Sequence, residues 1–142
     1  MRPIELKIKG INSYREEQVI NFNQLTSQGF FGIFGPTGSG KSTILDAITL
    51  ALYAKLPRGS KNFININETS ASVSFRFSIT TTETKEYLVE RSFRYPGKDR
   101  SSTARNTTAR LSLLSDVDTE ILADKPTDVT RSCTDLLGLS SD

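Results

Sequence analysis

Nine consecutive residues have the types and spacing needed to hold a polyphosphate. Residues 35–43 match the pattern G-x-x-x-x-G-K-[ST], the phosphate-binding P-loop. Its glycines let the backbone wrap closely and point successive N–H groups at an anion. The predicted phosphate-binding residues are Gly35, Pro36, Thr37, Gly38, Ser39, Gly40, Lys41, Ser42 and Thr43.

Two side chains of this motif could take part in chemistry. Lys41 would place a positive charge on the β- and γ-phosphates, and the Ser42 hydroxyl is positioned to bind Mg²⁺. Lys41 is therefore the candidate catalytic residue and Ser42 the candidate metal ligand. The dinucleotide fingerprint G-x-G-x-x-G is absent, because the glycines stand at 35, 38 and 40.

The motif is expected to lie between a strand and a helix, as a phosphate-binding loop requires. Residues 30–34 form a short apolar run that predicts a central strand. From Lys41 the pattern becomes helical and ends before Pro57, with an apolar stripe of Ile44, Ile48, Ala51 and Leu52 and with Leu45 beside it. Asp46 is interpreted as a first-turn charge that favours the helix dipole.

The rest of the chain is rich in period-two strands joined by short tips. Strands are predicted over residues 4–9, 18–22, 71–79, 87–95, 110–114 and 120–123. Residues 56–69 are expected to be a surface connection and 96–107 a basic loop. A last helix begins after Pro126, is capped by Thr127 or Asp128, and ends at Gly138.

This order of elements favours one class of P-loop protein. Nucleotide kinases alternate β-α-β in a parallel sheet, whereas the hairpins here indicate antiparallel pairing. The expected fold is α/β, a P-loop NTPase of the ABC/SMC-head type with a mixed sheet and an antiparallel β-subdomain. The 142 residues allow one domain or part of one.

Composition excludes several other functions. The chain has no histidine and a single cysteine, Cys133, so it can build neither a Cys/His zinc cluster nor a Ser-His-Asp triad nor an internal disulfide. Cys133 is expected in the core. No apolar run approaches the ~20 residues of a membrane span, and the N-terminus does not look like a secretory signal. We expect a soluble, cytoplasmic protein.

Residues 4–14 and 31–53 closely resemble the N-terminus of the SbcC family, the SMC-like ATPase subunits of SbcCD DNA-repair nucleases. Weaker similarity at residues 57–58 and 122–125 extends the resemblance over most of the chain. It implies that residues 1–142 are the N-terminal lobe of an ATP-binding head, with ATP and Mg²⁺ as cofactors. The implied partners are a C-terminal lobe, a second head joined through ATP, an SbcD-type nuclease subunit and double-stranded DNA.

The same resemblance bears on residues outside the motif. Asn12 and Ser13 match positions near the nucleotide, although an ordinary turn is an equal alternative. Arg58 and Lys61 lie where relatives approach the base, or simply in a solvated loop. Residues 111–116 are expected to be an exposed strand rather than a Walker B motif, so the lobe alone should not hydrolyse ATP.

One stretch is locally basic although the net charge of the chain is only +2. Between positions 91 and 110 the cations are Arg91, Arg94, Lys98, Arg100, Arg105 and Arg110, against the single acid Asp99. Such clustering suits phosphate contacts, or a solvated hairpin. Two alternative functions therefore stay open: a DNA-binding module using this stretch, and a small P-loop kinase with Arg100, Arg105 and Arg110 as lid residues.

Overall fold

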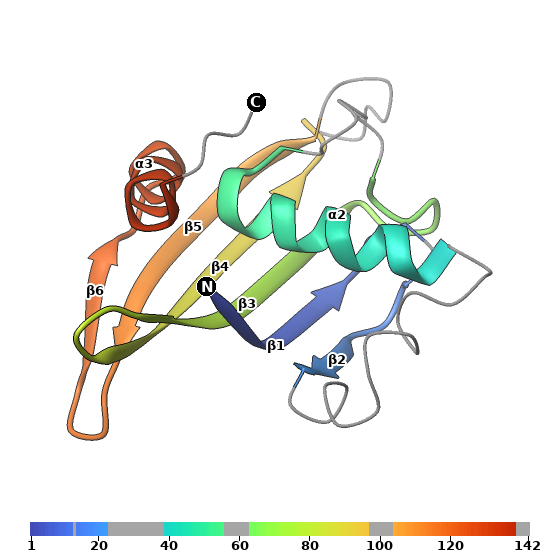
Figure 1. The fold of residues 1–142 in the computed structure, drawn as a ribbon. Coiled ribbons are helices and arrows are strands. Elements are labelled where there is room, and N and C mark those ends of the chain that lie inside the picture. Colours follow the sequence, from blue (N-terminus) through green and yellow to red (C-terminus); the bar gives the residue numbers. More distant parts are fainter. Residues whose placement is uncertain (13, 23–38, 56–62, 97–103, 139–142) are drawn as a thin grey trace.

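A computed structural model describes residues 1–12, 14–22, 39–55, 63–96 and 104–138, with the backbone alone for residues 39–43. Its strands form one six-stranded sheet in the order β2-β1-β3-β4-β5-β6 (Figure 1), and every neighbouring pair is antiparallel. The strands are β1 (Arg2–Lys9), β2 (Gln18–Asn21), β3 (Ser70–Thr80), β4 (Thr84–Arg94), β5 (Arg105–Leu114) and β6 (Thr119–Ala123).

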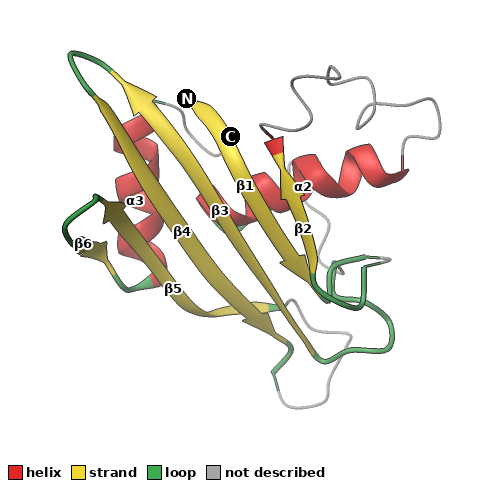
Figure 2. Cartoon of the chain, turned by 90° about the horizontal axis from the view of Figure 1, so that it is seen from below, coloured by secondary structure: helices red, strands yellow, loops and turns green. Residues whose placement is uncertain are grey.

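Two helices, α2 (Ser39–Tyr53) and α3 (Pro126–Leu137), cover one face of this sheet. Figure 2 shows the sheet in front and both helices behind it. The core lies between these layers, where alternate strand residues such as Leu6, Phe75 and Val89 are fully buried. The opposite face carries polar and charged side chains, as the alternating pattern of an antiparallel sheet with one solvated face requires.

The antiparallel predictions are confirmed. Strand β1 pairs with β2, and β3 pairs with β4 across a short tip with Thr80 opposite Thr84. The described strands therefore lack the parallel β-α-β arrangement expected of a kinase. The strand predicted over residues 30–34 lies outside the described residues.

The predicted loop over residues 96–107 is wrong at its end, because β5 begins at Arg105. The first residues of β5 are polar, yet they pair with the end of β4: Arg105 lies opposite Arg94, and Asn106 lies opposite Phe93. The register then shifts between Ser92 and Phe93. This β-bulge hides the period-two pattern, which is why the sequence suggested a loop.

Three local predictions are also corrected. Helix α2 begins at Ser39, so Asp46 is not the first-turn charge that was predicted: it lies beyond that turn and is buried. Helix α3 ends at Gly138 with left-handed backbone as expected, but its N-cap is Lys125, without a side-chain cap hydrogen bond. Pro126 starts that helix and needs no donor partner there. Residues 111–114 belong to β5, and Leu111 is fully buried rather than exposed.

None of the described helices is both long enough and apolar enough to cross a membrane.

Candidate functional site

The P-loop motif meets the fold at the amino end of α2, which begins at Ser39 within the motif. The first four backbone N–H groups of a helix have no partner inside it, and the helix dipole makes that end partially positive. An anion held by the motif would therefore meet N–H donors of this helix. This arrangement fits the phosphate tail of a nucleotide. Residues 35–38 lie outside the described residues.

Helix α2 is held firmly behind that end. Ala47, Leu50 and Ala51 are completely buried, and Ile44 is nearly so. They belong to the same apolar cluster as Phe75 and Phe77 on β3. The predicted apolar stripe is thus confirmed at Ile44, Ala51 and Leu52, whereas Ile48 is only partly buried and the fully buried Ala47 and Leu50 were not part of it. Leu45, by contrast, is 44% exposed on the side of the helix that the sheet does not cover.

The candidate residue Asn12 lies in a tight turn after β1. Gly10 and Asn12 both have left-handed backbone, with φ of 74° and 50°. The backbone N–H of Asn12 donates to the carbonyl of Phe63 at 2.7 Å, and that of Asn65 donates to the carbonyl of Gly10 at 2.7 Å. The turn is therefore rigid and tied to the segment after α2. The second candidate there, Ser13, lies outside the described residues.

Asn65 is a residue that sequence reasoning missed, because it falls in the segment expected to be a surface connection. Its side-chain amide donates to the carbonyl of Asn12 at 2.7 Å, and its Oδ1 accepts from the backbone N–H of Asn67 at 2.9 Å. Only 7% of the residue is exposed. The available signal was an asparagine among turn residues, which indicates a turn but not its partner. Arg58 and Lys61 lie outside the described residues.

The described arginines of the basic stretch, residues 91–110, do not all lie on the surface. Arg91 is only 1% exposed and points into the core side of the sheet, so it does not belong to a basic surface. Arg94 and Arg105 are exposed and directly opposite each other on β4 and β5. Arg110 is opposite Glu90 on the same two strands. Lys98 and Arg100 lie outside the described residues.

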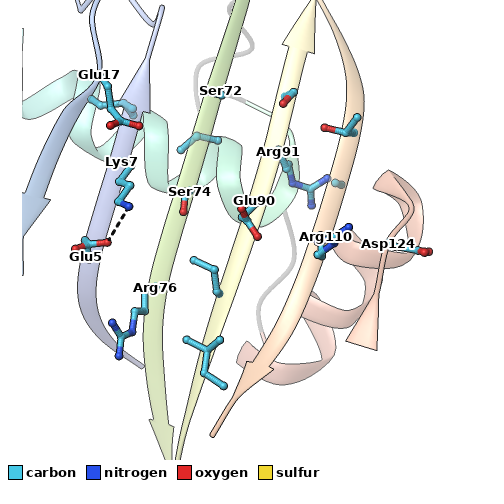
Figure 3. Close-up of a pocket in the computed structure, with 17 residues that line it drawn as sticks. Glu5, Lys7, Glu17, Ser72, Ser74, Arg76, Glu90, Arg91, Arg110 and Asp124 are labelled. Carbon is cyan, nitrogen blue, oxygen red and sulfur yellow. Dashed lines mark ion pairs between the residues drawn. The ribbon is translucent and has the colours of Figure 1, made fainter. Parts of the chain in front are cut away.

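The open face of the sheet has a hollow of about 750 Å³. Figure 3 shows the residues that line it. Its charged lining alternates in sign: Lys7 lies 3.9 Å from Glu5, and Arg110 shares the hollow with Glu90. Because phosphates require an excess of cations, this mixed surface is a poor nucleic-acid site. The hollow lies on the face opposite α2, which Figure 3 shows behind the strands.

Comparison with known proteins gives the class of this fold and motif. A family model described as an AAA domain matches residues 5–134. The chain therefore belongs to the AAA domain family, whose P-loop ATPase fold agrees with the predicted class. The sheet and helices described above are consistent with the N-terminal lobe of such a head.

Individual relatives make the comparison more specific. The chain is 48% identical over all of its 142 residues to the SbcC subunit of the SbcCD nuclease of Clostridium acetobutylicum, and 47% identical over its full length to the SbcC subunit of Bacillus subtilis. It is 41% identical over 66% of its length to a probable DNA double-strand break repair Rad50 ATPase of Aquifex aeolicus. The resemblance to the SbcC family is thereby confirmed. The chain spans 12% of the length of the first two relatives and 10% of the third.

Proposed function

We propose that this chain is the ATP-binding lobe of an SMC-like DNA-repair ATPase that acts in the cytoplasm. The observation that carries the proposal is the P-loop motif at the amino end of a helix packed on an antiparallel sheet, in a sequence 48% identical to an SbcC protein. ATP binding and hydrolysis would then be coupled to DNA end processing by a partner nuclease.

The proposed roles follow the chemistry of a bound Mg·ATP. The backbone of residues 35–43 surrounds the phosphates, Lys41 neutralises charge on the β- and γ-phosphates, and Ser42 donates an oxygen ligand to Mg²⁺. Asn12, in the rigid turn after β1, and Ser13 next to it in the sequence are proposed to support the nucleotide. When bound, Mg²⁺ would add Lewis-acid stabilisation of the phosphates.

Hydrolysis requires groups from other polypeptide segments in this proposal. A C-terminal lobe would supply the carboxylates that activate water, and a second head would close over the nucleotide. Leu45 on the uncovered side of α2 is the apolar contact point proposed for that lobe. The chain by itself would bind Mg·ATP weakly and release no ADP.

The proposed DNA contact rests on Arg94 and Arg105. Like charges directly opposite on neighbouring strands repel each other, so this pair costs stability unless an anion lies between them. Lys9 and Arg94 line a common hollow at the same end of the sheet. A phosphate backbone is the anion that this arrangement suits best.

The melting temperature with and without Mg·ATP tests the nucleotide site. A ligand at about 100 times its Kd stabilises the folded protein by about 2.7 kcal/mol, which raises the melting temperature of the wild type by several degrees. Lys41→Ala should lose this shift, and EDTA should reduce it. Lys7→Ala, which changes a lysine on the open face, should keep it.

The melts are run on the chain alone and with a C-terminal lobe added. If the wild type gains no stability in either form, or if Lys41→Ala gains as much as the wild type, the proposed nucleotide site is wrong.

A further inference from the structure

Arg91 caps the carboxyl end of the P-loop helix. The last four carbonyls of an α-helix lack intrahelical partners. In α2 the first of them, Leu50 O, accepts from the backbone N–H of Ala54 at 2.9 Å. The next two, Ala51 O and Leu52 O, accept from Arg91 Nε at 2.6 Å and from Arg91 Nη2 at 2.9 Å. A side chain from β4 thus binds two helix carbonyls whose residues lie 40 and 39 positions earlier in the chain.

The guanidinium group of Arg91 is fully satisfied. Arginine has five N–H donors. The acceptors are Ala51 O, Leu52 O, Asn106 Oδ1, Pro126 O and Thr130 Oγ1, at 2.6 to 3.3 Å. Each of these oxygens is uncharged, so the partially negative end of α2 is the electrostatic partner of the buried cation. Figure 3 shows the side chain between β4 and β5.

Asn106 connects this cap to strand β5 at the bulge. Its Oδ1 accepts from Arg91 Nη1 at 2.7 Å, while its Nδ2 donates to Ser92 O at 2.8 Å and to Thr108 O at 2.6 Å. The bulge turns Asn106 inward, although Thr107 and Thr108 that follow it are both exposed. The irregular pairing therefore places an amide oxygen beside the end of α2.

We propose that Arg91 is a positioning residue of the nucleotide site. It fixes the carboxyl end of α2 to β4, β5 and α3, and through this rigid helix it sets where the amino end meets the phosphates. The helix is 15 residues long, so the two ends lie roughly 22 Å apart. The inference deepens the proposed function, because it requires that the P-loop binds Mg·ATP.

The test is a calorimetric titration of Mg·ATP into the complete protein, well below the melting temperature of each variant. Arg91→Met should raise the Kd by about tenfold. Asn106→Ala removes one of the five acceptors of Arg91, together with the bonds to Ser92 O and Thr108 O, and should raise the Kd by about threefold. The Kd of Arg91→Lys for Mg·ATP should lie between that of Arg91→Met and that of the wild type, since lysine keeps three donors. Arg76→Met removes a half-buried arginine that pairs with Glu86 on the open face, and it should leave the Kd unchanged.

Amide hydrogen exchange distinguishes positioning from general stabilisation. In a variant that only loses global stability, the amide exchange rates rise by the same factor in the sheet and in α2. If the anchor of α2 is lost, the exchange rates rise in α2 while those in β3 and β4 stay unchanged. The proposal expects the second result for Arg91→Lys and Asn106→Ala, including the first turn of α2.

Two outcomes separate this inference from the proposed function. If the wild type binds Mg·ATP, Lys41→Ala does not, and Arg91→Lys and Asn106→Ala both bind like the wild type, the nucleotide site stands and the positioning role is overturned. Those two variants decide the question even if Arg91→Met does not fold. If the wild type itself does not bind Mg·ATP, both proposals fail.

Discussion

The side-chain amide of Asn65 donates a 2.7 Å hydrogen bond to the backbone carbonyl of Asn12, a residue 53 positions earlier. This contact joins the turn after β1 to the segment that leaves the P-loop helix. Since Asn65 is buried, its polar atoms cannot exchange these partners for water. The position of Asn12 is thus determined by a side chain far away in the sequence.

Asn65→Ala should lower the free energy of unfolding by about 1–3 kcal/mol, because the carbonyl of Asn12 and the N–H of Asn67 lose this partner. Urea unfolding followed by circular dichroism measures the loss. Asn67→Ala is the matched control: it keeps the backbone N–H that donates to Asn65, and its effect should stay within about 0.5 kcal/mol. Equal losses in both variants would contradict the assigned role.

Gly10→Ala should destabilise more than Gly138→Ala, although both glycines have left-handed backbone. A Cβ at Gly10 would lie 2.6 Å from the carbonyl oxygen of Ser70, whereas a Cβ at Gly138 would have nothing within 4 Å. We expect a loss of about 1 kcal/mol for Gly138→Ala and roughly 2–4 kcal/mol for Gly10→Ala. Thermal melts of the pair decide this, and a smaller effect at Gly10 would contradict the close packing of β1 on β3.

The free energy of unfolding should fall as the pH rises from 9 to 10. Burial raises the pKa of the Cys133 thiol from 9.0 to about 11, partly offset by Arg91. In this range the folded state keeps a proton that the unfolded state loses, so stability decreases with pH, by about 1 kcal/mol over the interval. Burial also raises the pKa of Tyr53, which acts in the same direction.

Arg91 contributes with the opposite sign, mainly near and above pH 10. Burial lowers the pKa of its guanidinium group to about 10, so around and above that value the unfolded state binds more protons and stability is regained. The thiol therefore gives the largest contribution between pH 9 and 10, where Tyr53 and Arg91 add smaller contributions of opposite sign to each other. Urea titrations at the two pH values, on the wild type and on Cys133→Ala, provide the check. The fall of the unfolding free energy between pH 9 and 10 should largely disappear in Cys133→Ala. An equal fall in both proteins would rule out the thiol as its source.

Replacing Arg94 and Arg105 by alanine should weaken the salt dependence of DNA binding in the complete protein. If both arginines contact phosphates, the slope of log K against log salt becomes shallower by about 2 for the double variant. Fluorescence anisotropy on a duplex at several salt concentrations measures it. Arg110→Ala, whose residue lies opposite Glu90, should not change the slope. A change of equal size at Arg110 would instead indicate a diffuse charge effect.

The sequence was most informative where local patterns act alone. Hydrophobic alternation correctly predicted β3 and β4 and the inward position of Tyr87, Val89 and Phe93, because the sheet has one buried face. The phosphate-binding loop is predicted from its spacing, since the glycines and Lys41 are each required by the ligand, and its residue roles stay predictions. The apolar stripe of α2 was found for the same local reason.

Long-range contacts escaped prediction for a physical reason. The guanidinium group of Arg91 and the amide of Asn65 acquire their roles in part from partners 40 and 53 residues away. Alternation with Val89 and Phe93 does place Arg91 on the inward face of the strand, but no local pattern identifies its hydrogen-bond partners. The beginning of β5 was missed because its bulge breaks the alternation on which the strand prediction depends.

The cap on the carboxyl end of α2 also has a consequence for biosynthesis. The helix leaves the ribosome before the strand that carries Arg91, and Thr130, another of the arginine's partners, follows 39 residues after that. Until Arg91 emerges, the carbonyls of Ala51 and Leu52 lack this partner. Folding of α2 during synthesis is therefore completed only after β4 has been made, and a chain stalled before residue 91 would keep this end of α2 open.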